Sequence, residues 1–306
     1  MRPATFGGPG WVPRVGEMAG ELGTLWAPMG VRQEAAPLRS VLLVEPPPRL
    51  GAVTNPDANL LLDHVDLGRI RAEYQGLGAA YEAAGVQVFR YAAPADAPPN
   101  LCFARDLFWA SPEGAVVGRM ASQVRAGEER FATQALAAAG FPIRATVGGA
   151  GLFEGADALW LSPDQVLFGV GRSNWTALAQ LQAMFPAISW LPVPVPEGVQ
   201  HLLGAVNFLD AHRVVLHPAA GEELRLLLRQ QGVECWEVED QEELTRYRAL
   251  NFVTLAPNKI LMPDRCPRTR RAWEARGIEV QTVVMEEYRK AAGGPGCLTG
   301  ILCRGP

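Results

Sequence analysis

The sequence predicts a mixed α/β fold built from a repeated module of two or three strands and one helix. Three observations lead to this class: apolar, β-rich runs recur over the whole chain, helix-like segments with charged faces lie between them, and two of the apolar runs contain a turn. The module returns about every 45 to 55 residues. The pattern alone leaves two arrangements open, a closed ring of modules and an asymmetric α/β sandwich.

The expected strand regions are runs rich in Val, Ile, Leu and aromatic residues. They cover residues 39–47, 85–93, 114–120, 158–171, 213–218, 251–263 and 278–285. Turn sequences interrupt two of these regions, Ser-Pro-Asp-Gln at 162–165 and Ala-Pro-Asn-Lys at 256–259. We therefore expect both regions to be hairpins, which a strictly alternating strand and helix order would not contain.

The expected helices are the segments in which apolar residues recur at helical spacing beside charged ones. They cover residues 66–85, 127–140, 175–185, 221–232 and 266–277. Most of them end at a glycine, the residue that most easily adopts the left-handed conformation that terminates a helix. This gives one helix for each repeat of the module.

No low-complexity linker divides the chain of 306 residues. We therefore expect one catalytic domain over residues 37–306. The first part of the chain is rich in glycine and proline, and we expect residues 1–36 to be a loosely structured N-terminal extension.

Charge and hydropathy exclude several classes of partner. The formal net charge is −4, and no run of Lys or Arg is interleaved with aromatic residues, so nucleic acid is not expected as a partner. No stretch approaches 18 uninterrupted apolar residues, and the N-terminal sequence lacks the apolar core of a signal peptide. We expect no membrane association and a cytoplasmic location, and homo-oligomer formation is left open.

The five cysteines agree with a reducing compartment. Cys102, Cys235, Cys266, Cys297 and Cys303 are widely spaced and form neither a C-x-x-C pair nor a Cys/His cluster with the spacing of metal ligands. We expect no disulfide framework and no bound metal. Cys102 and Cys235 have the sequence surroundings of packed strand residues.

Cys297 differs from the others because it lies in the sequence Gly-Gly-Pro-Gly-Cys-Leu-Thr-Gly. Glycine and proline at such density predict an open turn that presents the thiol. A small buried cysteine would be the alternative, because unreactive cysteines usually pack as small hydrophobic residues. This stretch by itself does not decide between the two.

Three further segments place polar residues at the entrance of apolar strands. Arg105 and Asp106 interrupt the apolar run Cys-Phe-Ala-Arg-Asp-Leu-Phe-Trp-Ala, and Glu154 and Asp157 lie in a glycine-rich bend. His201 stands at the head of another apolar stretch. Two neighbouring carboxylates and a histidine can act as acid, base or cation ligands. A surface turn, a hydrated loop and a structural histidine are the alternatives.

Taken in order, the motifs R-D, E-G-A-D, Q-H-L and G-C-L-T resemble those of the pentein superfamily of guanidino-modifying enzymes. Within it the chain is most similar to the dimethylarginine dimethylaminohydrolase and arginine deiminase branch. The resemblance extends over residues 30–303, nearly the whole chain. It implies a five-bladed α/β propeller of pseudo-repeated ββαβ modules around a central pore.

The resemblance also implies roles for individual residues. Cys297 matches the nucleophile that attacks the guanidinium carbon and forms a covalent thiouronium. His201 matches the general acid and base. Asp106 and Glu154 match the carboxylates that hold the guanidinium, and Asp157 is expected to orient His201.

Several positions depart from the pattern of the family. Ala156 stands where the family usually has the second glycine of E-G-G-D, and Leu203 stands where deiminases carry a second guanidinium-binding aspartate. Ser173 occupies the place of the arginine that binds the substrate carboxylate, with Arg172 beside it. Arg172 and Arg105 are therefore included among the expected substrate-binding residues.

The resemblance predicts a hydrolase that acts on a C–N bond of a guanidino compound without a metal or other cofactor. Because Leu203 removes one carboxylate from the expected guanidinium site, an N-substituted, dimethylarginine-like substrate is favoured. Arginine deimination and amidino transfer are alternatives with the same chemistry. A non-catalytic pentein that only binds such compounds is an alternative of another class.

Overall fold

Five small sheets of the same construction make up the body of the molecule. The computed structural model describes residues 1–305, and in that range it contains five separate three-stranded sheets. In each sheet the middle strand pairs antiparallel with the first strand and parallel with the third. A long helix connects the middle strand to the third, so each module has the order ββαβ. The predicted modular α/β fold is confirmed.

The elements of the modules have the following bounds. The first strands are β3 (Phe108–Ser111), β6 (Ala158–Ser162), β9 (Val206–Phe208), β12 (Val253–Ala256) and β15 (Gly300–Arg304). The middle strands are β4 (Gly114–Val117), β7 (Gln165–Val170), β10 (Arg213–Leu216), β13 (Lys259–Pro263) and β1 (Leu38–Val44). The third strands are β5 (Ile143–Thr146), β8 (Ser189–Pro194), β11 (Glu234–Glu237), β14 (Glu279–Val283) and β2 (Gln87–Tyr91). The connecting helices are α4 (Glu128–Ala138), α5 (Trp175–Met184), α7 (Glu222–Gln230), α9 (Pro267–Glu274) and α2 (Leu67–Ala83).

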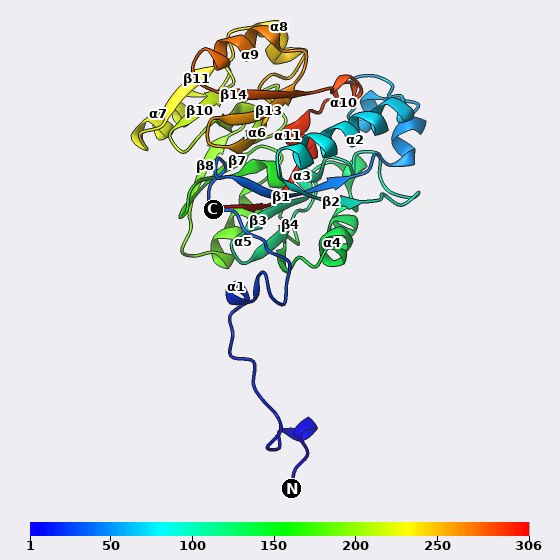
Figure 1. The fold of residues 1–306 in the computed structure, drawn as a ribbon, viewed down its shortest axis with the longest axis vertical. Coiled ribbons are helices and arrows are strands. Elements are labelled where there is room, and N and C mark those ends of the chain that lie inside the picture. The colour runs from blue at the N-terminus through cyan, green and yellow to red at the C-terminus, as the bar shows by residue number, and fades with distance from the viewer. Residues whose placement is uncertain (306) are drawn as a thin grey trace.

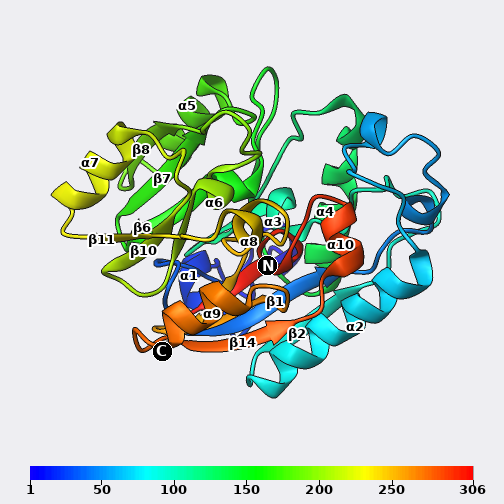
Figure 2. The same cartoon turned by 90° about the horizontal axis from the view of Figure 1, so that it is seen from above.

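Shorter helices complete the structure. Four of them lie directly before a first strand: α3 (Ala104–Leu107), η5 (Gly155–Asp157), α6 (Leu202–Ala205) and α11 (Pro295–Leu298). The others are α1 (Met18–Glu21), α8 (Gln241–Thr245), α10 (Glu286–Lys290), η1 (Ala4–Phe6), η2 (Pro48–Ala52), η3 (Asp57–Asn59) and η4 (Gln123–Arg125). In the view from above, α2, α5 and α7 lie at the periphery, whereas α3 and α6 lie near the centre (Figure 2).

One module is formed from both ends of the domain. Strand β15, near the C-terminus, pairs with β1, and Val41 lies opposite Ile301 in this register. In Figure 1 these two strands, blue and dark red, run side by side through the middle of the body. The pairing brings the segment that contains Cys297 back beside the first module of the chain.

All five predicted long helices are present. Four of them are followed by a glycine in the left-handed conformation, with φ values of 77° at Gly85, 79° at Gly140, 72° at Gly232 and 86° at Gly277. These residues are the helix stops that the sequence indicated. Both predicted hairpins are also present, as β6–β7 and β12–β13.

The sequence expectations omit several strands and misplace one cysteine. Strands β3, β9, β15, β5 and β8 have no counterpart among the expected regions, because they are short or alternate with half-buried positions instead of forming long apolar runs. Cys235 lies in β11, as expected. Cys102 is buried, but it lies in a turn before α3 and not in a strand.

The first strands of neighbouring modules pack closely against one another. The rings of Trp109 in β3 and Trp160 in β6 stack with their centroids 5.0 Å apart. In the last module the Tyr81 hydroxyl lies 2.6 Å from the Thr299 hydroxyl, just before β15. The residues that precede the first strands are therefore attached to a rigid core.

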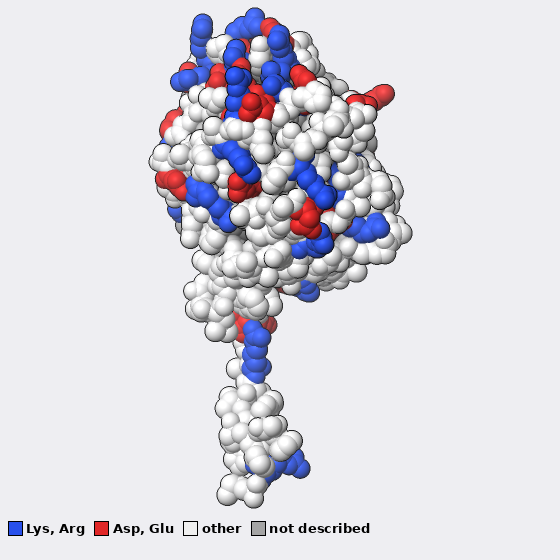
Figure 3. Space-filling view, turned by 90° about the vertical axis from the view of Figure 1, so that its right-hand side faces the viewer, with Lys and Arg blue, Asp and Glu red and all other residues white. Residues whose placement is uncertain are grey.

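The N-terminal part of the chain leaves the body as an extended tail. Figure 1 shows this tail running away from the sheets, and in Figure 3 it is mostly free of charged side chains. Packing nevertheless begins before the expected boundary at residue 37. Met29 and Val31 are buried, Gly30 bridges to Cys303 in β15, and Glu34 is buried against the body. The last part of the expected loose extension, from about residue 29, thus belongs to the packed structure, because the edge of β15 and the buried Arg105 are available to hold it.

None of the helices within residues 1–305 has the combination of length and apolar character that crossing a membrane requires.

Candidate active site

Each module contributes one polar side chain at the same place, just before its first strand. Asp106 lies in α3 before β3, Glu154 precedes η5 and β6, and His201 precedes α6 and β9. Asn251 directly precedes β12, and Cys297 lies in α11 before β15. The repeated fold therefore brings together five residues that are far apart in the sequence.

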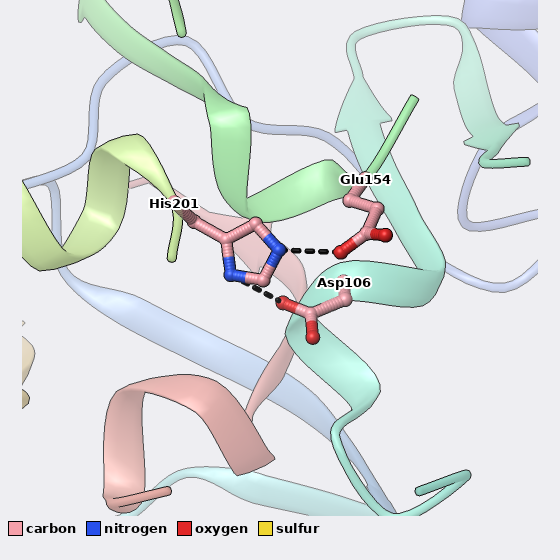
Figure 4. A group of neighbouring side chains, drawn as sticks. All are labelled: Asp106, Glu154 and His201. Carbon is pink, nitrogen blue, oxygen red and sulfur yellow. Dashed lines mark hydrogen bonds and ion pairs between the residues drawn. The ribbon is translucent and has the colours of Figure 1, made fainter. Parts of the chain in front are cut away.

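His201 is held between two buried carboxylates. Its Nε2 atom bonds to Oε2 of Glu154, and its Nδ1 atom lies 3.7 Å from Oδ1 of Asp106 (Figure 4). Burial alone lowers the pKa of His201, but the surrounding carboxylates outweigh burial and raise it to about 9. Burial would raise the pKa of Glu154, yet His201 holds it well below its usual range. At neutral pH the pair is therefore an imidazolium and a carboxylate.

Asp106 has one satisfied oxygen and one free oxygen. Its Oδ2 accepts a hydrogen bond of 2.6 Å from Nη1 of Arg125. Its Oδ1 is buried without a hydrogen-bond partner among residues 1–305. Because a buried carboxylate oxygen without a partner is costly, this atom calls for a donor that the protein does not itself supply. Asp106 lines a small cavity, of about 20 Å³, together with His201 and Cys297.

The Cys297 thiol is half-buried and bonded to Asn251. The Asn251 Nδ2 atom donates to Sγ at 2.8 Å, and the Cys297 backbone N–H donates to Asn251 Oδ1 at 3.2 Å. Burial raises the pKa of the thiol and the nearby Asp106 carboxylate adds to this effect, while the hydrogen bond from Asn251 lowers it. The thiol of the free site is therefore neutral at pH 7 and already has a donor in place for the thiolate.

The glycine-rich stretch before Cys297 does not form the open turn that the sequence predicted. It enters the short helix α11. A Cβ atom on Gly294 or on Gly296 would lie 2.9 Å from Oδ1 of Asn251. The glycines at these positions thus allow Asn251 to approach the Cys297 backbone closely.

No protein-family model matches the chain. Among curated proteins, an N(G),N(G)-dimethylarginine dimethylaminohydrolase from Streptomyces coelicolor is 27% identical over 267 residues, covering 86% of this chain and 96% of the relative. An arginine deiminase from Listeria monocytogenes is 24% identical over 260 residues, covering 68% of this chain and 62% of the deiminase.

Solved structures match over more of the chain. A dimethylarginine dimethylaminohydrolase from Pseudomonas aeruginosa, in complex with citrulline, superposes with a TM-score of 0.72 at 18% identity, covering 87% of this chain and all of the other. An inosamine-phosphate amidinotransferase from Streptomyces griseus superposes with a TM-score of 0.70 at 17% identity, covering 90% of this chain and 97% of the other.

The chain has the pentein fold. The predicted five-bladed α/β arrangement and the resemblance to this superfamily are confirmed. The ββαβ modules described above are its blades.

The resemblance implied that Asp157 orients the ring of His201, but in the structure Asp157 bonds to other groups. Its Oδ1 accepts from the Leu202 backbone N–H at 2.9 Å, and its Oδ2 accepts from the Ser173 hydroxyl at 2.6 Å. Burial raises the pKa of Asp157 to about 6. The imidazole of His201 is bonded to Glu154 instead, so Asp157 fixes the backbone beside the histidine and not the ring itself.

Arg105 and Arg172 were both expected at the substrate site, but in the structure only Arg172 lines the small cavity. Arg105 donates to Oε1 of Glu34 at 2.9 Å, in a buried pair away from the cavity that contains Cys297. The N-terminal segment supplies this partner, which is why the sequence motif alone misplaced the arginine. Arg172 does line the small cavity, and its Nη1 lies 3.7 Å from Oε2 of Glu154.

Two aromatic residues of the predicted motif segments, Phe103 and Trp175, lie in different surroundings. Phe103 lines the small cavity, whereas Trp175, at the start of α5, is 61% exposed.

Two further residues of the site were not identified from the sequence. Arg125 is fully enclosed and bonds to Asp106 at 2.6 Å and to Glu128 at 2.8 Å, and it lies 3.6 Å from Glu154. Burial lowers the pKa of Arg125, but the three carboxylates raise it well above its usual value. The other residue is Asn251, whose one available signal was its place directly before a first strand.

Asp106, Glu154 and His201 also form the one group of potential metal ligands found among residues 1–305, with ligand atoms within 4.8 Å of one another. Their charges are already balanced, because His201 is protonated at neutral pH and Arg125 lies against both carboxylates. A divalent cation would have to displace these positive groups. The arrangement therefore suits an organic cation that is held by hydrogen bonds better than a metal ion.

Proposed function

We propose that this protein is a hydrolase that cleaves a C–N bond of an N-substituted guanidino compound through a covalent intermediate on Cys297. One observation carries the proposal: a thiol, an imidazolium and an unpartnered carboxylate oxygen face the same small cavity. A guanidinium has the N–H donors that Oδ1 of Asp106 lacks.

The first step joins the thiol to the substrate. Asp106 holds the guanidinium N–H groups, the Cys297 thiol loses its proton to solvent as the substrate binds, and the thiolate sulfur adds to the central carbon. His201 then donates a proton from Nδ1 to the leaving nitrogen, because Glu154 holds its Nε2. The C–N bond breaks, an amine departs, and a thiouronium on Cys297 and a neutral His201 remain.

The second step hydrolyses the thiouronium. Neutral His201 takes a proton from water, and the hydroxide adds to the same carbon. The C–S bond then breaks as the remaining hydroxyl proton passes to solvent, which releases a ureido product and the Cys297 thiolate. Asn251 donates to that sulfur at 2.8 Å and stabilises the negative charge as it forms.

The substrate itself activates the thiol. In the free site burial raises the pKa of Cys297, so little thiolate is present at pH 7. A bound guanidinium places a positive charge beside the sulfur and lowers this pKa. All five cysteines are free thiols within residues 1–305, in agreement with the cytoplasmic location that we propose.

Leu203 favours an N-substituted guanidine over arginine. The side chain lines a cavity of about 370 Å³ that adjoins Cys297 and His201. Plain arginine would meet an alkyl group here where a deiminase offers a carboxylate, whereas an N-alkyl substituent gains an apolar contact. Dimethylarginine-like hydrolysis is therefore the first candidate, with arginine deimination and amidino transfer to an amine as alternatives.

A panel of guanidino compounds tests the proposal. We expect release of an amine and formation of a ureido product from N-alkylated guanidines, with ammonia release from unsubstituted guanidines at least about tenfold slower. Liquid chromatography with mass detection follows each product. Consumption that occurs only when an acceptor amine is added would show amidino transfer, and binding without turnover of any compound would show a non-catalytic pentein.

The pH dependence of the rate constants should report the pKa of His201 and the pKa of the Cys297 thiol. Because His201 has a pKa of about 9, its acid form is present below that pH and is lost as the pH rises through it. The rate constant kcat/KM should therefore fall above about pH 9. Bound substrate lowers the pKa of the thiol, so the acidic limb of kcat should lie at lower pH than that of kcat/KM. Initial rates between pH 5 and about 10.5 measure both limbs, and a loss of activity centred near 6.5, the ordinary pKa of histidine, would contradict the assignment.

A further inference from the structure

The cavity of about 370 Å³ beside Cys297 extends away from the carboxylates of the site. It shares Gln200, His201, Ala292 and Cys297 with the small cavity, but Asp106 does not line it. We call it the large cavity. In the proposed function the guanidinium fills the small cavity and its N-alkyl group contacts Leu203, so the rest of the large cavity is available for a second part of the same substrate.

The lining of the large cavity has an excess of positive charge. It includes Arg248, His201 and His217, and no Asp or Glu among the described residues. Nδ1 of His217 accepts from the Ala219 backbone N–H at 3.1 Å, which leaves its Nε2–H as a donor. Burial lowers the pKa of His217, so this neutral form is the one present at pH 7.

Arg248 has no protein partner for its charge. Four arginines have a buried Nε without a hydrogen-bond partner among residues 1–305, and three of them have other contacts that hold the guanidinium. Arg71 pairs with Glu45, Arg105 pairs with Glu34, and Arg304 donates to backbone carbonyls. No such ion pair or hydrogen bond holds Arg248 within the described part of the chain.

The backbone conformation of Arg248 is also unusual. Its φ is 59°, in the left-handed region that non-glycine residues seldom adopt. Residues in this region often lie at binding and active sites. The charge of Arg248 reaches the nucleophile, since it lowers the pKa of the Cys297 thiol.

The rest of the lining is apolar. Leu203, Leu244 and Leu250 line the same space and suit a short alkyl chain. A substrate with a guanidinium at one end, a few methylene groups and an anion at the other end would satisfy every part of this arrangement.

We infer that Arg248 and the large cavity form an anion-binding subsite, and that the substrate is a guanidino acid whose carboxylate contacts Arg248. This inference rests on the proposed function and adds the chemical class of the substrate arm. The subsite does not include Arg172, which lines the small cavity and lies near Glu154.

Two matched alkylating probes test the subsite without a known substrate. N-(3-carboxypropyl)-2-chloroacetamidine and N-butyl-2-chloroacetamidine share the cationic amidine and differ in the terminal charge. In both, the Cys297 sulfur displaces chloride, so that a C–S bond forms as the C–Cl bond breaks. The readout is the ratio of the two rates of Cys297 labelling, because a general change in thiol reactivity affects both probes alike.

We expect the full-length protein to react at least about tenfold faster with the carboxylate probe. Arg248→Gln should abolish this preference, and Arg248→Lys should retain part of it because the charge remains. Arg246→Gln, an exposed arginine two positions away, serves as the matched control and should keep the full ratio. Circular dichroism and thermal melting of each variant verify that it is folded.

The possible outcomes distinguish a failure of the anion-binding subsite from a failure of the proposed function. Labelling of Cys297 without a preference, or a preference that Arg248→Gln keeps and Arg172→Gln loses, would overturn the inference and leave the proposed function standing. Failure of both probes to label Cys297 would contradict the proposed function, and the inference with it.

Discussion

Replacing Cys297 with serine is expected to reduce turnover of guanidino compounds by at least about 10⁴-fold while leaving the fold intact. A serine hydroxyl is not deprotonated by a neighbouring guanidinium at neutral pH, whereas the thiol is brought into its reactive form. The substitution changes one atom in a half-buried side chain, and Asn251 can donate to oxygen as it does to sulfur. The melting temperature should therefore stay within about 2 °C of the parent.

A second cysteine in the same module supplies the control. Cys303 lies in β15, is half-buried, and lines neither cavity that contains Cys297. Cys303→Ser should retain turnover and should still be labelled by a haloacetamidine at Cys297. Substantial activity in Cys297→Ser, or equal labelling of Cys102 or Cys303 in the parent protein, would show that the nucleophile has been misassigned.

Replacing His201 with alanine is expected to lower kcat by about 10² to 10⁴-fold, the usual contribution of a general acid and base. The loss should depend on the leaving group. A guanidine with a good leaving group needs little proton donation in the first step, so its first step should be affected least. Steady-state rates for leaving amines of graded pKa measure this dependence. His212→Ala, in an exposed loop, is the control and should behave like the parent protein.

Asp106→Asn should fail in a different way from the His201 variant. It retains the shape of the side chain but removes the charge that faces the guanidinium, so capture of the substrate is weakened. A charge-assisted hydrogen bond of about 1.5 to 3 kcal/mol corresponds to one to two decades in kcat/KM. An equal loss for all leaving groups in both variants would mean that His201 and Asp106 act at the same step.

The repeated fold could be predicted from the sequence because its signals are local. Helix stops at Gly85, Gly140 and Gly232, and turns within two strand regions, depend only on neighbouring residues. The motifs that contain Asp106 and His201 also precede strands, and the structure places both at the small cavity.

Other features could not be predicted because they depend on contacts between distant segments. Asn251 lies in an ordinary apolar sequence, and the pairing of β15 with β1 is part of what brings α11 and Cys297 to it. Arg105 is held by Glu34, from a segment whose composition indicated loose structure. That Glu154 and not Asp157 bonds to His201 follows from which carboxylate reaches the imidazole, a matter of a few ångströms that spacing in the sequence does not encode.

The covalent thiouronium on Cys297 is the central claim, and peptide mass spectrometry of an acid-quenched single turnover tests it most directly. The His201→Ala variant is mixed with a slight molar deficit of a guanidine that bears a good leaving group, quenched, and digested. We predict a mass increase equal to the amidine fragment, on the peptide that contains Cys297, because attack proceeds and hydrolysis of the adduct is slow. Full release of the leaving amine in the parent protein, with an adduct neither in the parent nor in the variant, would contradict the mechanism.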